Sequence, residues 1–354
     1  MTSNTRAPVM VAMSGGVDSS VAAALLRDDG YEVVGVTLRL WGGESDTGCC
    51  AVSDVDDARR VADSLGIEHH VFNLGDDFER DVVAPYVADH AMGRTPNPCV
   101  ECNRHLKFHR LRNRAAALGY DRIATGHHAR IVERPDGTRR IARALDTAKD
   151  QSYVLHMLDQ VQMAGLLLPI GDLTKDEVRR HAAAIGLRTA NKPDSQDVCF
   201  ITRARGREDF LGQRMALTPG RVVDASGVEV GTVDAVELVT IGQRRGLALA
   251  GGAAPRYAVD VDMPTATVTV GSAGDLLTDE TLVDGCTWTG TSTSFPPVNL
   301  SVQTSAHGAA EPATLVGELN QLTVQWAQPH RRVAPGQSVV FYEADEVVGG
   351  ATAC

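Results

Sequence analysis

A regular alternation of two kinds of segment runs from Pro8 to about Leu187 and limits the folds that this chain can adopt. Short runs rich in β-branched residues predict strands, and the amphipathic stretches between them predict helices. In chain order, the first predicted elements are a strand over 9–13, a helix over 19–29, a strand over 32–38, a helix over 54–65 and a strand over 68–73. Strands joined by crossover helices lie parallel, so we predict a doubly wound α/β domain with its ligand at the carboxyl ends of the strands.

The sequence after about Arg205 has a different texture, because helical periodicity largely disappears. Short alternating runs are separated by turn residues such as Ser226-Gly227 and Pro335-Gly336. This pattern predicts two small, mainly β domains, of which the last is a barrel. We therefore predict an α/β catalytic domain over residues 1–205, a small β-rich domain over 206–277 and a β-barrel domain over 278–354.

The composition predicts a cytoplasmic protein that does not enter a membrane. No stretch approaches the ~20 apolar residues of a membrane span, and the first residues lack the apolar core of a signal peptide. In a reducing compartment, the 7 cysteines are expected to be reactive, metal-binding or buried groups. The net charge of −11 excludes indiscriminate coating of nucleic acid. Arginine-rich runs at 104–114 and 203–214 each follow a cysteine, and each is either a solvated face or a phosphate-binding patch.

The segment Ser14-Gly15-Gly16-Val17-Asp18-Ser19-Ser20 joins the first predicted strand to the first predicted helix. Its two glycines let successive backbone amides converge on an anion at the positive end of the helix dipole. It lacks the lysine of a Walker loop and the Gly-x-Gly-x-x-Gly spacing of dinucleotide sites. It resembles the Ser-Gly-Gly-x-Asp-Ser loop of the ATP pyrophosphatase (PP-loop) superfamily. That resemblance implies cleavage of ATP between its α and β phosphates and an adenylated intermediate.

Three cysteines lie in segments of unusual composition. Cys99 and Cys102 stand three residues apart, directly before a helix that we predict over the arginine-rich run at 104–114. A thiol at a helix N-terminus near Arg and Lys has a lowered pKa, so Cys102 is a candidate nucleophile. Cys199 lies in the polar segment Asp194–Phe200. Taken alone, a Cys-x-x-Cys pair is more typical of a zinc or redox site than of sulfur transfer.

Segments spread over nearly the whole chain resemble the tRNA-specific 2-thiouridylase family, which makes 2-thiouridine at the wobble position of tRNA. These segments are 13–20, 48–50, 95–103, 124–130, 149–153, 194–200, 240–247 and 335–342. By this resemblance Cys102 is the nucleophile, Cys199 carries a persulfide, and a disulfide joins them after sulfur transfer. It also implies ATP with Mg²⁺ near Asp18, and as partners tRNA and a sulfur donor protein or sulfide.

The same resemblance assigns residues to two binding sites. The implied ATP site consists of Ala12, Met13, Ser14, Gly15, Gly16, Val17, Asp18, Ser19, Leu38 and Gly126. The implied border of the target base is Asn97, Pro98 and Cys99, and the implied tRNA contacts are His127, Lys149, Asp150, Gln151 and Gln337. Each of these contacts also has an ordinary structural alternative, such as a helix cap for Asp150.

Two departures from the family pattern leave alternatives open. Some members carry an acidic residue where this chain has Cys99, so Cys99, Cys102 and Cys199 could instead hold a [4Fe–4S] cluster that carries the sulfur. Residues 304–307 lack arginines that the family often shows, so we assign no tRNA contact there. The competing functions are another adenylating PP-loop enzyme, similar to an amidotransferase or argininosuccinate synthetase, and an RNA-binding regulator whose three cysteines hold zinc.

Overall fold

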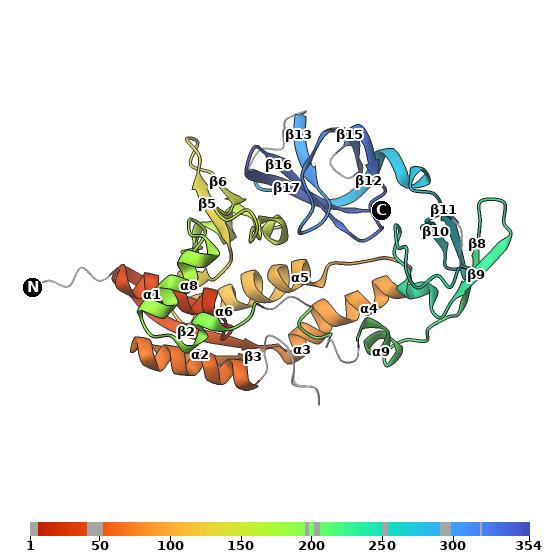
Figure 1. The fold of residues 1–354 in the computed structure, drawn as a ribbon. Coiled ribbons are helices and arrows are strands. Elements are labelled where there is room, and N and C mark those ends of the chain that lie inside the picture. The colour runs from red at the N-terminus through yellow and green to blue at the C-terminus, as the bar shows by residue number, and fades with distance from the viewer. Residues whose placement is uncertain are drawn as a thin grey trace, which may run out of the picture.

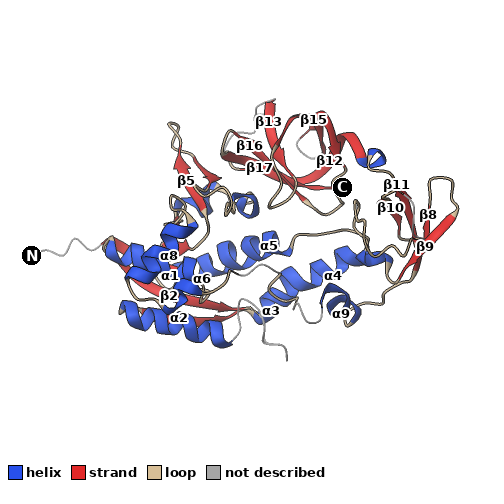
Figure 2. Ribbon diagram, in the orientation of Figure 1, coloured by secondary structure: helices blue, strands red, loops and turns tan. Residues whose placement is uncertain are grey.

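The computed structural model describes residues 6–40, 52–194, 198–201, 206–249, 254–290, 299–318 and 321–354. The strands in these ranges form three sheets, and the colours from red to blue in Figure 1 follow the chain through them. Helices gather around the first sheet, whereas the other two regions consist mainly of strands (Figure 2). No helix within the described ranges is long and apolar enough to cross a membrane.

The first sheet is parallel, with strand order β3-β2-β1-β4-β7. Its strands are β1 (Arg6–Ala12), β2 (Tyr31–Arg39), β3 (Glu68–Asn73), β4 (Arg122–Thr125) and β7 (Leu166–Leu167). Ala12 at the end of β1 pairs with Val36 of β2 on one side and with Thr125 of β4 on the other. Because the strand order reverses at β1, the doubly wound arrangement is confirmed, and β1 ends at the switch point where such sheets bind ligands.

Helices cover both faces of this sheet. The side chains of β1 show this, since successive side chains of a strand point to opposite faces. Val9 and Val11 pack against α1, α2 and α8, whereas Met10 faces a second cluster with α4 and a long helix over 98–117. The helices are α1 (Val17–Asp28), α2 (Val52–Leu65), α3 (Gly75–Phe78), the π-helical η1 (Glu79–Val83), α4 (Ala84–Ala91), α7 (Gln160–Ala164), α8 (Lys175–Ala184) and α9 (Gly206–Gly212). The long helix consists of α5 (Pro98–Glu101), the π-helical η2 (Cys102–Arg110) and α6 (Leu111–Ala117).

The second half of the chain forms two sheets, as the sequence predicts. The middle sheet has the order β10-β11-β8-β9, from β8 (Gly220–Val223), β9 (Glu229–Val233), β10 (Tyr257–Asp262) and β11 (Thr267–Gly271). The last sheet contains β12 (Leu277–Trp288), β13 (Asn299–Gln303), β14 (Glu311–Glu318), β15 (Gln321–Arg331), β16 (Ser338–Glu343) and β17 (Glu346–Ala353). It closes into a barrel because β12 pairs with both β15 and β17.

A hairpin of β5 (Ala129–Glu133) and β6 (Arg139–Arg143) departs from the predicted alternation. The pattern over 8–187 predicts parallel strands with crossover helices, but β5 and β6 are antiparallel and extend the barrel sheet. Figure 1 shows this yellow hairpin beside the blue barrel. Ion pairs fasten the two together, from Arg130 to Asp345, from Arg134 to Glu346 and from Arg140 to Glu343 and Glu346. Local periodicity carries no signal of such distant partners.

Candidate active site

The predicted phosphate loop lies where β1 ends and α1 begins. Gly15 adopts a φ of 71°, and Gly16 is the N-cap residue of α1. The backbone N of Ser14 donates to Ser19 Oγ at 3.1 Å, which ties the two ends of the loop together. Residues 12–19 therefore lie at the carboxyl end of the central strand, and Leu38 lies at the carboxyl end of the neighbouring β2.

Two glycines allow close approach around this loop. A Cβ on Gly126, which follows β4, would lie 2.4 Å from the backbone N of Ser19, and one on Gly15 would lie 2.3 Å from Asp54 O. Lys192 Nζ reinforces the second contact by donating to Gly15 O at 3.0 Å and to Asp54 Oδ1 at 2.7 Å. The residues predicted for the ATP site therefore share one edge of the sheet, with Gly126 directly against the first turn of α1.

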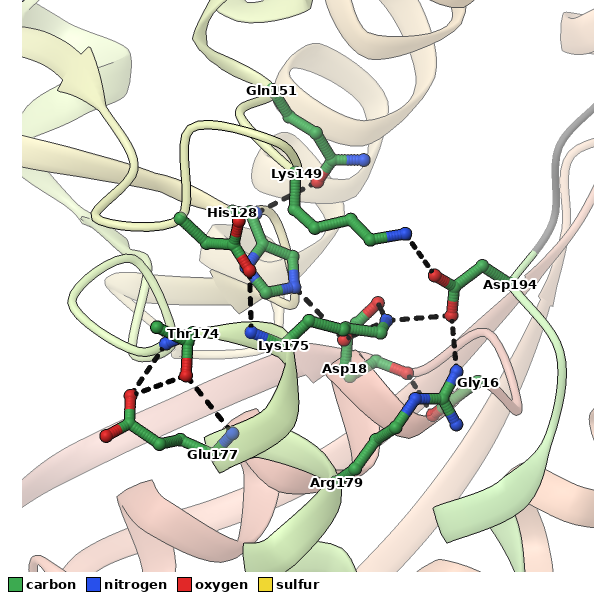
Figure 3. A network of polar contacts seen from close by, with 12 residues as sticks. Gly16, Asp18, His128, Lys149, Gln151, Thr174, Lys175, Glu177, Arg179 and Asp194 are labelled. Carbon is green, nitrogen blue, oxygen red and sulfur yellow. Dashed lines mark hydrogen bonds and ion pairs between the residues drawn. The ribbon is translucent and has the colours of Figure 1, made fainter.

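A network of charged side chains lies beside the loop (Figure 3). Both oxygens of Asp18 accept hydrogen bonds from Lys175 Nζ at 2.7 Å, and Asp18 Oδ1 lies 3.2 Å from His128 Nε2. Burial raises the pKa of Asp18, but the hydrogen bonds from His128 and Lys175 outweigh burial and hold the pKa below its usual value. Lys175 Nζ also lies 2.9 Å from Asp194 Oδ1. Lys175 is thus a buried cation held between two carboxylates at the start of α8.

Asp194 gathers three cations from different parts of the chain. Its carboxylate lies 2.8 Å from Lys149 Nζ and 2.9 Å from Arg179 Nη2, in addition to Lys175. Burial raises the pKa of Asp194, yet the hydrogen bonds from Lys149 and Lys175 bring it down to about 2. An ionised carboxylate therefore links the phosphate loop, through Lys175, to the segment that leads to Cys199.

The helix that carries the first two cysteines begins earlier than the sequence analysis predicts. Asn97 is its N-cap, with Oδ1 accepting from the backbone N of Cys99 at 3.1 Å, and Pro98 occupies the first helical position. Both residue types favour a helix start. The prediction that the helix follows Cys102 is therefore wrong. The exposed Cys99 lies in the first turn, where the helix dipole acts, and Cys102 lies in the second.

Cys102 and Cys199 contribute to one apolar cluster. Cys102 is 8% exposed, and the half-buried Cys199 packs against the same cluster. The ring of the adjacent Phe200 lies 5.5 Å, centroid to centroid, from both Phe78 and Tyr86. These edge-to-face contacts anchor the Cys199 segment against α3 and α4. The two cysteines predicted to be catalytic therefore both contact the same extended apolar cluster, although they are far apart in the sequence.

The cysteines do not form a metal site in this arrangement. A structural zinc ion or a [4Fe–4S] cluster needs three or four ligands that converge on one volume. Across the part of the chain that the structure describes, no three His, Cys, Asp or Glu side chains gather in a way that could hold a metal ion. Cys99 is exposed at the head of its helix, whereas Cys102 is buried. The expected metal set of Cys99, Cys102 and Cys199 therefore does not fit.

Two of the predicted tRNA contacts, Gln151 and Lys149, bind residues of the charged network. Gln151 is exposed, and its Oε1 accepts from the backbone N of His128 at 2.9 Å. Lys149 is half-buried in its ion pair with Asp194. Figure 3 shows both side chains at the charged network, which Gln151 contacts through His128 and Lys149 through Asp194.

The side chains of the other three predicted contacts form hydrogen bonds or ion pairs within the protein. Asp150 accepts from the backbone N of Ala144 and of Ser152, and it pairs with Arg143 at 2.9 Å. His127 is buried with Nδ1 2.7 Å from Thr125 Oγ1, and burial holds its pKa well below the usual value, so the ring is neutral. Gln337 donates from Nε2 to Thr95 O. The contacts with tRNA remain predictions for all five residues.

Sequence reasoning missed Lys175 and Arg179, whose side chains complete the charged network. One signal was present: Thr174 and Glu177 form a capping box that starts α8, which places Lys175 in the first turn of that helix. The partner of Lys175, however, is the Asp18 carboxylate, which lies 157 residues away in the chain. No local sequence pattern predicts such a pairing.

The switch-point loop with its charged network defines an α/β nucleotide-binding domain, and comparison with known proteins agrees. Residues 7–203 match the model described as "tRNA methyl transferase HUP domain". Residues 208–272 match a "tRNA methyl transferase PRC-barrel domain", and residues 278–353 match an "Aminomethyltransferase beta-barrel domain".

Individual relatives identify the family. The chain is 46% identical to the tRNA-specific 2-thiouridylase MnmA of Acidothermus cellulolyticus, over 97% of this chain and 96% of that one. It is also 46% identical to the protein of the same name from Mycobacteroides abscessus, over 97% of this chain and 98% of that one. The chain belongs to the tRNA-specific 2-thiouridylase family.

Proposed function

We propose that this protein is a tRNA-uridine 2-sulfurtransferase. It uses ATP to activate O2 of the wobble uridine as an adenylate and then replaces that oxygen with sulfur carried on a cysteine. One observation carries the proposal: a complete Ser-Gly-Gly-x-Asp-Ser loop and a shared apolar cluster with Cys102 and Cys199 occur in the same α/β domain.

The proposal extends to the setting of the reaction. We place the enzyme in the cytoplasm, where tRNA and reduced thiols occur together, and we assign the sulfur to a donor protein or to sulfide. We divide the chain into a catalytic domain over 1–205, a β-rich domain over 206–277 and a barrel domain over 278–354.

In the adenylation step, uridine O2 attacks the α phosphate of ATP and pyrophosphate leaves. The loop amides at the start of α1 bind the phosphate oxygens. Asp18 is ionised and partly exposed, which fits the single carboxylate through which Mg²⁺ is commonly held beside substrate phosphates. Bound there, Mg²⁺ would neutralise phosphate charge. Lys175 already touches Asp18, so its ammonium is placed to stabilise negative charge on the departing pyrophosphate.

In the sulfur-transfer step, the terminal sulfur of a Cys199 persulfide attacks C2 of the adenylated uridine, and AMP leaves. The Cys102 thiolate then attacks Cys199 Sγ and breaks the sulfur–sulfur bond, so that the terminal sulfur stays on C2. The products are 2-thiouridine and a Cys102–Cys199 disulfide. The apolar surroundings of Cys102 support this step because they keep water from the adenylate.

The competing functions fit the site less well. A small-molecule adenylating enzyme has no need of Cys102 and Cys199 beside one apolar cluster, and a zinc-bearing regulator has no need of the network around Asp18. Because the three cysteines do not converge as metal ligands, we derive no step through a [4Fe–4S] cluster.

The proposal is tested with purified protein, unmodified tRNA, ATP and a persulfide donor, because sulfide alone cannot convert a reduced Cys199 thiol to a persulfide without an oxidant. We expect pyrophosphate release that depends on tRNA, and 2-thiouridine in the nucleosides of the reacted tRNA by mass spectrometry. Asp18→Ala should lose both products, whereas Asp28→Ala, which changes an exposed carboxylate at the other end of α1, should keep them. Pyrophosphate without 2-thiouridine would leave an adenylating enzyme with another acceptor. Absence of both would reject the proposal.

A further inference from the structure

Thr95 lies two residues before the helix cap Asn97, and residues from both β regions hold it. Its backbone N donates to Pro335 O at 2.7 Å, and its O accepts from Gln337 Nε2. Its Oγ1 lies 3.2 Å from Thr240 Oγ1. The barrel therefore binds the main chain of Thr95, while the middle region binds its side chain.

The turn at Gly336 packs closely against the link between α4 and α5, residues 92–97. A Cβ on Gly336 would lie 3.1 Å from the backbone N of Thr95 and 3.1 Å from Arg94 Cβ. The φ of Gly336 is +88°, which also disfavours any side chain there. The barrel thus approaches the link between α4 and α5 as closely as its backbone allows.

The middle region holds the end of α4 on the other side of the link. Buried His90 has Nδ1 3.2 Å from Glu237 O, and a Cβ on Gly93 would lie 2.8 Å from Met263 Cγ. Both ends of the short link are therefore fixed, one by the α4 contacts and the other by the helix over 98–117. Thr95 is the point in this link where all three regions meet.

Little flexibility separates Thr95 from the cysteines. Pro96 and Pro98 each fix one backbone dihedral, and Asn97 between them caps the helix. Cys102 follows in the second turn of that helix. A displacement of Thr95 would consequently move Asn97–Cys99 and Cys102 together.

From these contacts we infer that Gln337 and Thr240 are positioning residues for the segment 97–102. This inference rests on the proposed function, in which that segment borders the target base and carries the nucleophile. Gln337 then acts on this segment through the main chain of Thr95. The two β regions set the distance between the base and the sulfur site, because each binds a different part of the same residue.

Steady-state and binding measurements on Gln337→Ala and Thr240→Val test the inference. We expect the thiolation rate at saturating tRNA to fall about 10- to 100-fold, since misplacement by ~1 Å has effects of this size. The Kd for tRNA and the Kd for ATP should stay within about 2-fold, because neither residue then touches a ligand. Gln328→Ala, which changes an exposed glutamine on the same barrel, should behave as wild type. A weaker Kd for tRNA with an unchanged saturating rate would overturn the inference and make Gln337 a tRNA contact.

A Thr95→Val background separates the two β regions. Thr240→Val should have no further effect there, since the hydroxyl that it contacts is already gone, whereas Gln337→Ala should retain its effect because it bonds the main chain. A full additional loss from Thr240→Val would overturn the role of Thr240. If Gln337→Ala proves unstable on thermal unfolding, Gln337→Glu takes its place, because glutamate keeps the size of the side chain but lacks the donor. We expect Gln337→Glu to lower the thiolation rate in the same way. Wild-type protein that makes no 2-thiouridine would reject the proposed function itself, which is a different outcome.

Discussion

The phosphate loop and the cysteine site lie in the same α/β domain but are held in place by different forces. Around the loop, ionised groups contact one another directly, as in the chain from Asp18 through Lys175 to Asp194. Around Cys102, apolar side chains surround the thiol, and the segment before it is held from outside the domain through Thr95. The charged contacts around the loop therefore all lie within one domain, whereas the segment before Cys102 is contacted by all three regions.

Substitution of a cysteine should separate the two halves most strongly. Adenylation uses only ATP and the base oxygen, so Cys199→Ser should still release pyrophosphate, at about one equivalent or less per tRNA. Its yield of 2-thiouridine should fall by about 10³-fold or more, because the atom that carries sulfur is missing. Both products are measured in one reaction, by phosphate coupling and by nucleoside mass spectrometry. A wild-type yield of 2-thiouridine would remove Cys199 from the mechanism.

A substitution at Lys175 should have the opposite effect, a loss of adenylation with normal sulfur loading. Lys175→Met should slow tRNA-dependent pyrophosphate release by about 10²- to 10³-fold, as expected for loss of one preorganised charge at a developing anion. Persulfide loading on Cys199, read by mass spectrometry of the protein, should be unchanged. Arg179→Met is the matched control, since Arg179 pairs with Asp194 but has no contact with Asp18 among the hydrogen bonds of the described residues. Equal losses from both variants would show that the network acts only as a structural unit.

Gly126→Ala tests the close approach between β4 and the loop. The added Cβ would lie 2.4 Å from the backbone N of Ser19, so we expect a loss of about 1–3 kcal/mol in the free energy of unfolding. The affinity for ATP should fall as well, because the first turn of α1 must move. Gly274→Ala serves as control, as the nearest atom to its Cβ would be Ser272 Oγ at 3.6 Å. Denaturant unfolding and ATP titrations of both variants measure these effects. A Gly126→Ala variant with an unchanged free energy of unfolding and an unchanged affinity for ATP would contradict the close contact between Gly126 and Ser19.

The smallest effect should come from the basic face of the long helix. Arg104 and Lys107 are the cations of this helix that follow Cys102 most closely in the sequence, so we expect them to contact phosphate. Neutralising both should reduce the slope of log Kd for tRNA against log salt by about 1–2, at ~0.9 for each contact. Because Arg104 must first leave Glu101, 3.4 Å away, the loss of affinity should be modest. Binding titrations at several salt concentrations measure it, and an unchanged slope would make this face ordinary solvated surface.

Local patterns predicted the parts of the molecule that depend on local physics. The strand predicted over 68–73 is β3 (Glu68–Asn73), and the phosphate loop lies between strand and helix as its glycines require. The start of the cysteine helix was also a local matter, but its signal is the pair Asn97-Pro98 and not the arginine-rich run that follows.

Contacts between distant segments could not be predicted in this way. The pairing of Lys175 with Asp18 and the bond from Gln337 to Thr95 both depend on how whole elements pack, which periodicity does not encode. The sequence therefore indicated which residue types take part in the chemistry. It gave no sign of which other side chains hold them in position.

The hairpin of β5 and β6 has a consequence for the newly synthesised chain. Its sheet partner β17 is the last strand in the sequence, so the ribosome must add about two hundred further residues before β6 can pair. Until then the hairpin exposes an open strand edge, which is a template for association between chains. During that interval Arg130, Arg134 and Arg140 lack the acidic partners that they have in the folded protein, and like charges on an open edge disfavour pairing with a second hairpin. We therefore expect the charges that later bind the barrel to disfavour aggregation of the unfinished protein.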